Sequence, residues 1–197
     1  MVRPDISDKL IHFTSGASHD EAFGILRQII DECRLLGGCR KIRGEYNCVC
    51  FTEAPLASLE NGLVNPKAYS RYSPFGVMFE KQWIFEQGGR PVIYQPDSEF
   101  NELPESMRWR HVRYEPGDID FTWEREWRLP CKALEFTPNV AGIVVPTEDW
   151  AAAFHGEHAE EQDWIVYQYA QIMDELLAEQ YREHFPWRIY VLGNVTF

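Results

Sequence analysis

The chain has 197 residues, of which 45% are hydrophobic and 14% are aromatic. This apolar content is enough to build one buried core, and it excludes a disordered or fibrous protein. No run approaches the ~20 apolar residues of a membrane-spanning helix, and the polar first ten residues lack the apolar stretch of a secretory signal. We therefore expect a single cytoplasmic domain over residues 1–197, with no membrane partner.

The formal net charge of −12 is concentrated toward the carboxyl end, because residues 148–184 contain ten Asp or Glu residues and one Arg. An acidic surface repels phosphate, so non-specific nucleic-acid binding is not expected. A local contact with nucleic acid is left open by a smaller group of basic residues, which consists of Arg34, Arg40, Lys41 and Arg43.

The five cysteines predict neither a disulfide framework nor a zinc ribbon, because their number is odd and no C-x-x-C pair occurs. Cys48 and Cys50 lack a nearby sequence cue for an activating base, and G-x-S-x-G is missing, so acyl transfer is disfavoured. His155 and His158 have no obvious third ligand, so no metal site is predicted.

In the first half of the chain, residues 9–15 predict a strand, and Ser18 followed by Glu21 is the capping box of a helix. Apolar residues recur at helical spacing up to Gly37-Gly38, where we expect the helix to end. Residues 47–53 predict the next strand.

Later strands are predicted at residues 91–95, 120–130, 140–146 and 188–197, and a long surface excursion at 96–118. Thr147 is expected to cap a helix, and the longest helix is expected from about Glu160 to His184, within an acidic helical segment at 148–184. The elements show no regular βαβ order and no phosphate-binding glycine loop. The sequence therefore predicts an α+β fold with a mixed, mainly antiparallel sheet flanked by helices.

The strand predicted at 120–130 places Glu124 and Glu126 on one face, two residues apart. A carboxylate pair in a cleft can hold a ribose hydroxyl and stabilise a developing positive charge. The alternative is a surface ion pair with a neighbour such as Arg128, which contributes little.

His12 and two loop tyrosines are the other candidates. His12 lies in the first strand, where a hydrogen-bonded structural role is the alternative to catalysis. Tyr69 and Tyr72 lie in a polar, aromatic loop and are suited to stacking on a flat ring, with ordinary loop packing as the alternative.

Five short motifs follow one another along the chain: IHFTS, CVCFTEAPL, YSRYSPFGVMFEKQW, RPVIY and TWEREWRLP. Taken together and in this order, they resemble bacterial abortive-infection proteins of the AbiGi type. The resemblance covers roughly residues 10–145 and leaves out the acidic helical tail.

The H-x-T start and the late glutamate strand are also remotely similar to DarT-like ADP-ribosyltransferases. This similarity implies a split pair of small sheets with NAD, as substrate, in the cleft between them. It implies that His12 and Thr14 position the ribose and the nicotinamide amide, and that Tyr69 or Tyr72 stacks on nicotinamide. It makes Glu126 the catalytic glutamate, while Glu124 helps to select the acceptor.

Two functions are therefore expected from the sequence. The first is an ADP-ribosyltransferase-like, NAD-binding domain of a phage-defence or toxin-antitoxin type system, which transfers ADP-ribose to a macromolecular acceptor. The second is a non-enzymatic antitoxin or interaction protein that covers a basic partner with its acidic helix, where charge complementarity speeds association.

Overall fold

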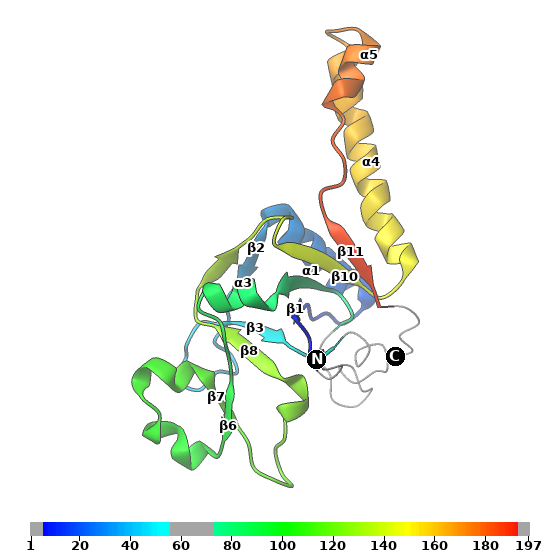
Figure 1. The fold of residues 1–197 in the computed structure, drawn as a ribbon. Coiled ribbons are helices and arrows are strands. Elements are labelled where there is room, and N and C mark those ends of the chain that lie inside the picture. The colour runs from blue at the N-terminus through cyan, green and yellow to red at the C-terminus, as the bar shows by residue number, and fades with distance from the viewer. Residues whose placement is uncertain (1–5, 56–72, 193–197) are drawn as a thin grey trace.

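The structure, a computed structural model, describes residues 6–55 and 73–192. Its largest sheet has seven strands in the order β11-β10-β4-β1-β3-β8-β5 (Figure 1). All neighbouring strands pair antiparallel except β10 and β11, which are parallel. The strands are β1 (Lys9–Phe13), β3 (Val49–Thr52), β4 (Gly76–Glu80), β5 (Arg90–Pro91), β8 (Glu126–Leu129), β10 (Ala141–Val145) and β11 (Arg188–Val191).

Two further sheets have two strands each: β2 (Arg34–Leu36) pairs antiparallel with β9 (Ala133–Glu135), and β6 (Ile93–Gln95) pairs parallel with β7 (His111–Arg113). The predicted α+β class with a mixed, mainly antiparallel sheet is confirmed. The described strands do not divide into a pair of small sheets, because one sheet of seven strands dominates.

Helix α1 (His19–Glu32) begins as its sequence predicts. The Ser18 hydroxyl accepts from the Glu21 amide at 3.1 Å, and the Glu21 carboxylate accepts from the Ala17 amide at 2.7 Å. The predicted end at Gly37-Gly38 is wrong, because Cys33 adopts the left-handed conformation and the following residues form β2. Pairing with β9 thus ends the helix before the glycines are reached.

Residues 96–118, predicted as a long surface excursion, contain local structure. They form two 3-10 helices, η1 (Asp97–Glu102) and η2 (Glu105–Arg110), and strand β7. Between the sheet strands, the short helix α3 (Lys81–Glu86) follows β4 directly.

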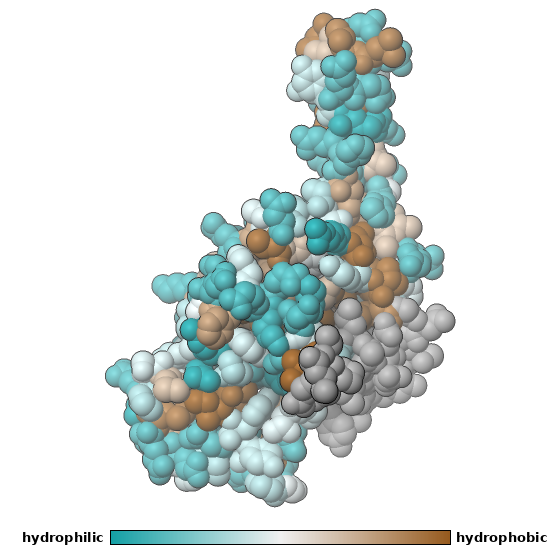
Figure 2. Space-filling view, viewed as in Figure 1, coloured by the Kyte–Doolittle hydropathy of each residue, from teal (hydrophilic) through white to brown (hydrophobic). Residues whose placement is uncertain are grey.

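The acidic segment forms an arm, defined here as residues 148–184, that projects from the body of the molecule (Figures 1 and 2). Helix α4 (Glu148–Ala170) makes its outward leg, followed by α5 (Glu175–Ala178) and η4 (Glu179–Tyr181) near the tip. The helix predicted after Thr147 begins at Glu148 as expected, but it continues to Ala170. The separate long helix predicted over 160–184 is therefore wrong. Asp174, whose side chain accepts from the Leu176 amide, then caps α5. No helix in the described ranges is long and apolar enough to span a membrane.

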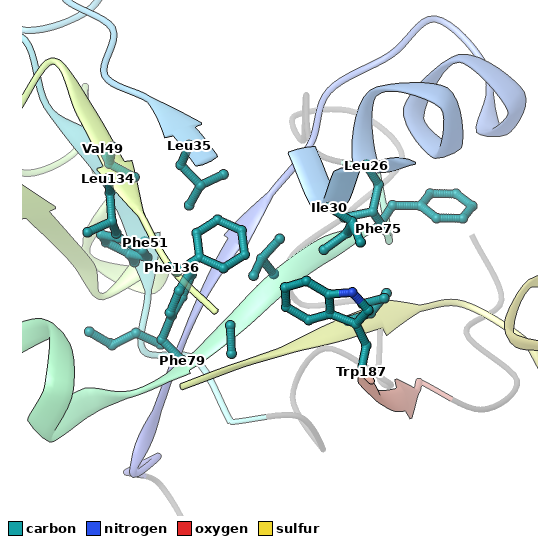
Figure 3. Close-up of a cluster of buried hydrophobic side chains, with 14 of the residues drawn as sticks. Leu26, Ile30, Leu35, Val49, Phe51, Phe75, Phe79, Leu134, Phe136 and Trp187 are labelled. Atoms are coloured by element: carbon teal, nitrogen blue, oxygen red, sulfur yellow. The ribbon is translucent and has the colours of Figure 1, made fainter. Parts of the chain in front are cut away.

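The main core lies on the sheet face that α1 covers (Figure 3). Because side chains alternate across a strand, β4 sends Val77 and Phe79 to this face and Met78 to the opposite one. Leu26 and Ile30 reach the core from α1. The other buried side chains labelled in Figure 3 are Leu35, Val49, Phe51, Phe75, Leu134, Phe136 and Trp187.

Candidate functional site

The two glutamates lie where a tight turn enters strand β8. Residues Thr122–Glu124 form the 3-10 turn η3, and Arg125 adopts a left-handed conformation with φ of +47°. The strand predicted over 120–130 is therefore wrong in its first half, because a left-handed residue breaks the two-residue alternation of an extended chain. Glu126 begins the strand and Glu124 lies on the turn before it.

Hydrogen bonds from two neighbouring segments fix the backbone of this turn. The Thr52 hydroxyl donates to the Glu124 carbonyl at 2.5 Å, and the Glu53 amide donates to the Arg125 carbonyl at 3.2 Å. The Tyr94 hydroxyl accepts from the Glu126 amide at 3.1 Å and donates to the Phe121 carbonyl at 3.2 Å. Burial raises the pKa of Tyr94 to about 12, so this donor keeps its proton at neutral pH.

Two adjoining hollows meet at Glu124, Glu126 and Cys50, which line both of them. The smaller one has a volume of about 60 Å³ and is mainly apolar. Its other lining residues are Ile11, His12, Phe13, Phe51, Thr52 and Trp123. The larger one has a volume of about 530 Å³, and its other lining residues are Lys41, Ile42, Arg43, Asp97, His111, Val112, Arg113, Phe121 and Arg128.

Of the residues predicted for the site, His12, Glu124 and Glu126 therefore come together in the smaller hollow. Thr14 does not line either hollow, and its buried hydroxyl donates to the Phe75 carbonyl at 3.1 Å. Tyr69 and Tyr72 lie outside the described residues.

Glu126 is held in a two-pronged ion pair with Arg128. The distances are 2.8 Å from Nε to Oε1 and 3.2 Å from Nη2 to Oε2, and the two side chains are 13% and 6% exposed. Arg128 Nη1 donates to the carbonyls of Trp109 and His111 at 3.0 and 2.9 Å. The ion pair that was the alternative expectation thus exists, but it is buried, where losing one partner leaves the other charge uncompensated.

The surroundings of Glu124 differ from those of the ion-paired Glu126. Its carboxylate has no hydrogen bond or ion pair with any part of the chain that the structure describes. Burial, together with the charge of Glu126, raises the pKa of Glu124 to about 7, although Lys41 and Arg128 oppose the shift. A carboxyl group with such a pKa can take up and release a proton at neutral pH.

His12 is a neutral hydrogen-bonding group in this environment. Burial lowers its pKa, and Nδ1 lies 2.8 Å from the Cys50 carbonyl oxygen. In the neutral ring, an Nδ1–H that donates to this carbonyl leaves Nε2 as an acceptor.

The cysteines at the site are poor nucleophiles. Burial and the nearby charge of Glu126 raise the pKa of Cys50, and burial raises that of Cys48 to about 11. Because the thiolate is the reactive form, neither residue is activated at neutral pH.

Basic side chains from distant segments line the larger hollow. Arg43 pairs with Asp97 at 2.9 Å and lies over the Phe100 ring, while Arg113 pairs with Glu115 at 2.9 Å. Lys41 is exposed, and its charge acts on Glu124. Sequence reasoning picked out the Lys41 and Arg43 group but not its proximity to the glutamates, and it missed Thr52, Tyr94 and Arg113, for which no local pattern gives a signal.

No group of three or more metal-binding side chains lies close enough together to hold an ion within the described ranges. Searches of protein-family models, curated proteins and solved structures give no match to this chain.

Proposed function

We propose that the protein is an ADP-ribosyltransferase-like enzyme that uses NAD and belongs to a phage-defence or toxin-antitoxin type system. The proposal includes the finer fold assignment, ADP-ribosyltransferase-like, which rests on the motif resemblance. The single observation that carries it is the meeting of Glu124, with its pKa of about 7, and the fixed Glu126 at the boundary of two hollows.

The size and charge of the larger hollow support a dinucleotide ligand. Its volume of about 530 Å³ lies within the range of roughly 300–1,000 Å³ that is common for small-molecule sites. Among its basic side chains, Arg43, Arg113 and Arg128 are each paired with a carboxylate. Lys41 has no carboxylate partner in the described ranges and is the residue that favours an anionic pyrophosphate. The reacting ribose would then lie at the boundary between the hollows, where both glutamates are.

In the proposed reaction, the bond between ribose C1′ and the nicotinamide nitrogen breaks and its electron pair leaves with neutral nicotinamide. The ribose becomes oxocarbenium-like, and the Glu126 carboxylate, which Arg128 holds in place, accepts a hydrogen bond from a ribose hydroxyl. A nucleophilic atom of the acceptor bonds to C1′ and loses its proton to the Glu124 carboxylate. The contacts thus favour Glu126 as the fixed hydrogen-bond acceptor and Glu124 as the proton carrier.

The test is release of nicotinamide from NAD by the purified chain, together with transfer of labelled ADP-ribose to proteins or nucleic acids of a cell lysate. We expect Glu124→Gln to lower the rate by about 10²- to 10⁴-fold, the usual contribution of a general base. Glu102→Gln, on an exposed side chain outside both hollows, is the matched control and retains full activity. If the wild-type chain neither binds NAD in calorimetry nor releases nicotinamide, the proposed function is wrong.

A further inference from the structure

The distal part of the arm exposes a cluster of large apolar side chains. Six of the ten exposed large hydrophobic residues within the described ranges lie here. Figure 2 shows the apolar surface at the end of the arm, away from the body. These six residues, called the tip cluster below, and their exposed fractions are Trp164 58%, Tyr167 56%, Ile172 78%, Leu176 81%, Leu177 51% and Tyr181 48%.

The tip cluster is built on an ordered frame. The rings of Trp164 and Tyr167 stack with centroids 5.6 Å apart, and those of Tyr169 and Tyr181 stack at 4.1 Å. The Asp174 cap fixes the start of α5. Aromatic and aliphatic anchors that are already held in place lose little conformational entropy on binding, which favours recognition by a partner.

The arm supports itself through contacts between its two legs. Arg182 pairs with Asp163 at 2.7 Å and with Glu179 at 2.9 Å, and the Glu183 amide donates to the buried Gln162 side chain at 2.9 Å. Near the body, Phe154 packs on Phe23 of α1 with ring centroids 4.9 Å apart. The tip cluster is therefore not needed to attach the arm to the core. Single exposed hydrophobic residues are common on protein surfaces, but a group of six in one part of the arm is not explained in that way.

Carboxylates are interspersed along the chain with the tip-cluster residues, at Asp163, Asp174, Glu175, Glu179 and Glu183. Arg182 is the one Lys or Arg residue of the arm, and it pairs with Asp163 and Glu179. A second copy would bring two strongly acidic arms together, and anionic lipid or nucleic acid would also be repelled. An apolar groove with Lys or Arg residues on its rim is complementary both to the apolar tip cluster and to the negative charge of the arm.

We propose that the arm is a docking element whose tip cluster inserts into an apolar groove, rimmed by basic residues, on a different protein. The hydrophobic centre supplies affinity, and the acidic rim supplies orientation and fast association. No tip-cluster residue lines either hollow of the candidate site, so the docking role is independent of the proposed NAD chemistry.

The test is photo-crosslinking in cells of the organism that encodes the chain, with a photoreactive amino acid at position 176 of the full-length protein. We expect one dominant adduct whose crosslinked peptide comes from another protein and contains apolar residues flanked by Lys or Arg. A probe at position 36 is the matched control, because Leu36 is 66% exposed on the body, and it gives no such adduct.

Two sets of variants distinguish docking into a specific groove from non-specific hydrophobic association. Ile172→Ser with Leu177→Ser is expected to lower the yield of the adduct by about tenfold or more, because both side chains leave the apolar contact. Asp174→Asn with Glu175→Gln is expected to lower the yield and its sensitivity to salt, because rim charges act mainly on association. Glu124→Gln leaves the yield unchanged, which distinguishes this proposal from the enzymatic one.

The proposal is overturned if the adduct is a second copy of the chain, a lipid or a nucleic acid, or if no adduct forms. It is also overturned if the Ile172→Ser and Leu177→Ser variant crosslinks as well as the wild type. Circular dichroism of each variant checks that the arm keeps its helical content.

Discussion

Arg128 donates two hydrogen bonds to the Glu126 carboxylate, and its remaining nitrogen, Nη1, donates to two backbone carbonyls from the segment around β7. These contacts tie strand β8 to a segment almost twenty residues away, and they pair the buried Glu126 carboxylate with a guanidinium group. Glu124, two residues earlier, makes no hydrogen bond with Arg128, and its pKa is raised. Two carboxylates that are neighbours in sequence thus have different roles available to them.

Breaking this pair should destabilise the fold strongly. Arg128→Met leaves the Glu126 charge buried and unpaired, and it also removes the donor to two carbonyls. We expect a loss of about 3–5 kcal/mol in the free energy of unfolding, measured by urea denaturation. Arg182→Met, which removes two exposed ion pairs on the arm, is the control and should leave the transition almost unchanged. Equal effects of the two changes would show that the buried pair is not special.

Glu124 should make stability depend on pH. Its folded-state pKa of about 7 is above the ordinary value of 4.5, so the folded protein binds the extra proton between these values. This contribution is fully present below about pH 4.5 and is lost as pH rises through about 7, on the order of 3 kcal/mol in all. Urea denaturation of wild type and Glu124→Gln from pH 4 to 8 measures it. A stability difference between the two that stays constant with pH would contradict the raised pKa.

The rate of NAD cleavage, if the proposed function holds, should follow the same group. Because the base must be ionised to accept a proton, kcat/KM should rise with pH to a plateau above about 7. In Glu124→Gln the residual rate should lack this rise. A profile with the same shape in both proteins would assign the proton transfer to another residue.

Cysteine reactivity should follow exposure and pKa. Cys39 is exposed, whereas burial and Glu126 raise the pKa of Cys50. Alkylation with iodoacetamide at pH 8, followed by peptide mass spectrometry, should therefore modify Cys39 first and Cys50 at least about tenfold more slowly. Faster labelling of Cys50 would mean that its thiol is activated and would reopen a nucleophilic role.

Gly76 should not tolerate a side chain. A Cβ at this position in β4 would lie 2.5 Å from the His12 carbonyl oxygen on the paired strand, so Gly76→Ala must push β1 and β4 apart. We expect a loss of about 1–3 kcal/mol by thermal or urea unfolding. Gly24→Ala on α1, where a Cβ meets nothing within 4 Å, is the matched control and should stabilise by about 0.5–1 kcal/mol. If Gly76→Ala were as stable as Gly24→Ala, the close strand pairing would be in error.

The local sequence determined the parts of the fold that depend on neighbouring residues. The Ser18 and Glu21 pair predicts the start of α1, and apolar alternation or apolar runs predict β1, β3 and β10. These signals succeed because caps and side-chain periodicity are set within a few residues. They also predict the α+β class. The expectation that an early histidine and a late glutamate share one site came instead from the motif resemblance, and both residues line the smaller hollow.

Tertiary structure alone decided three features: the turn at Arg125, the different surroundings of Glu124 and Glu126, and the exposed end of the arm. Thr52 and Tyr94, far from Glu124 in sequence, hold that turn, and the partners of Arg128 come from another segment. Burial, pKa and exposure depend on which distant groups the fold brings close to a side chain. No pattern along the chain encodes them, because the energies involved arise between residues that become neighbours only after folding.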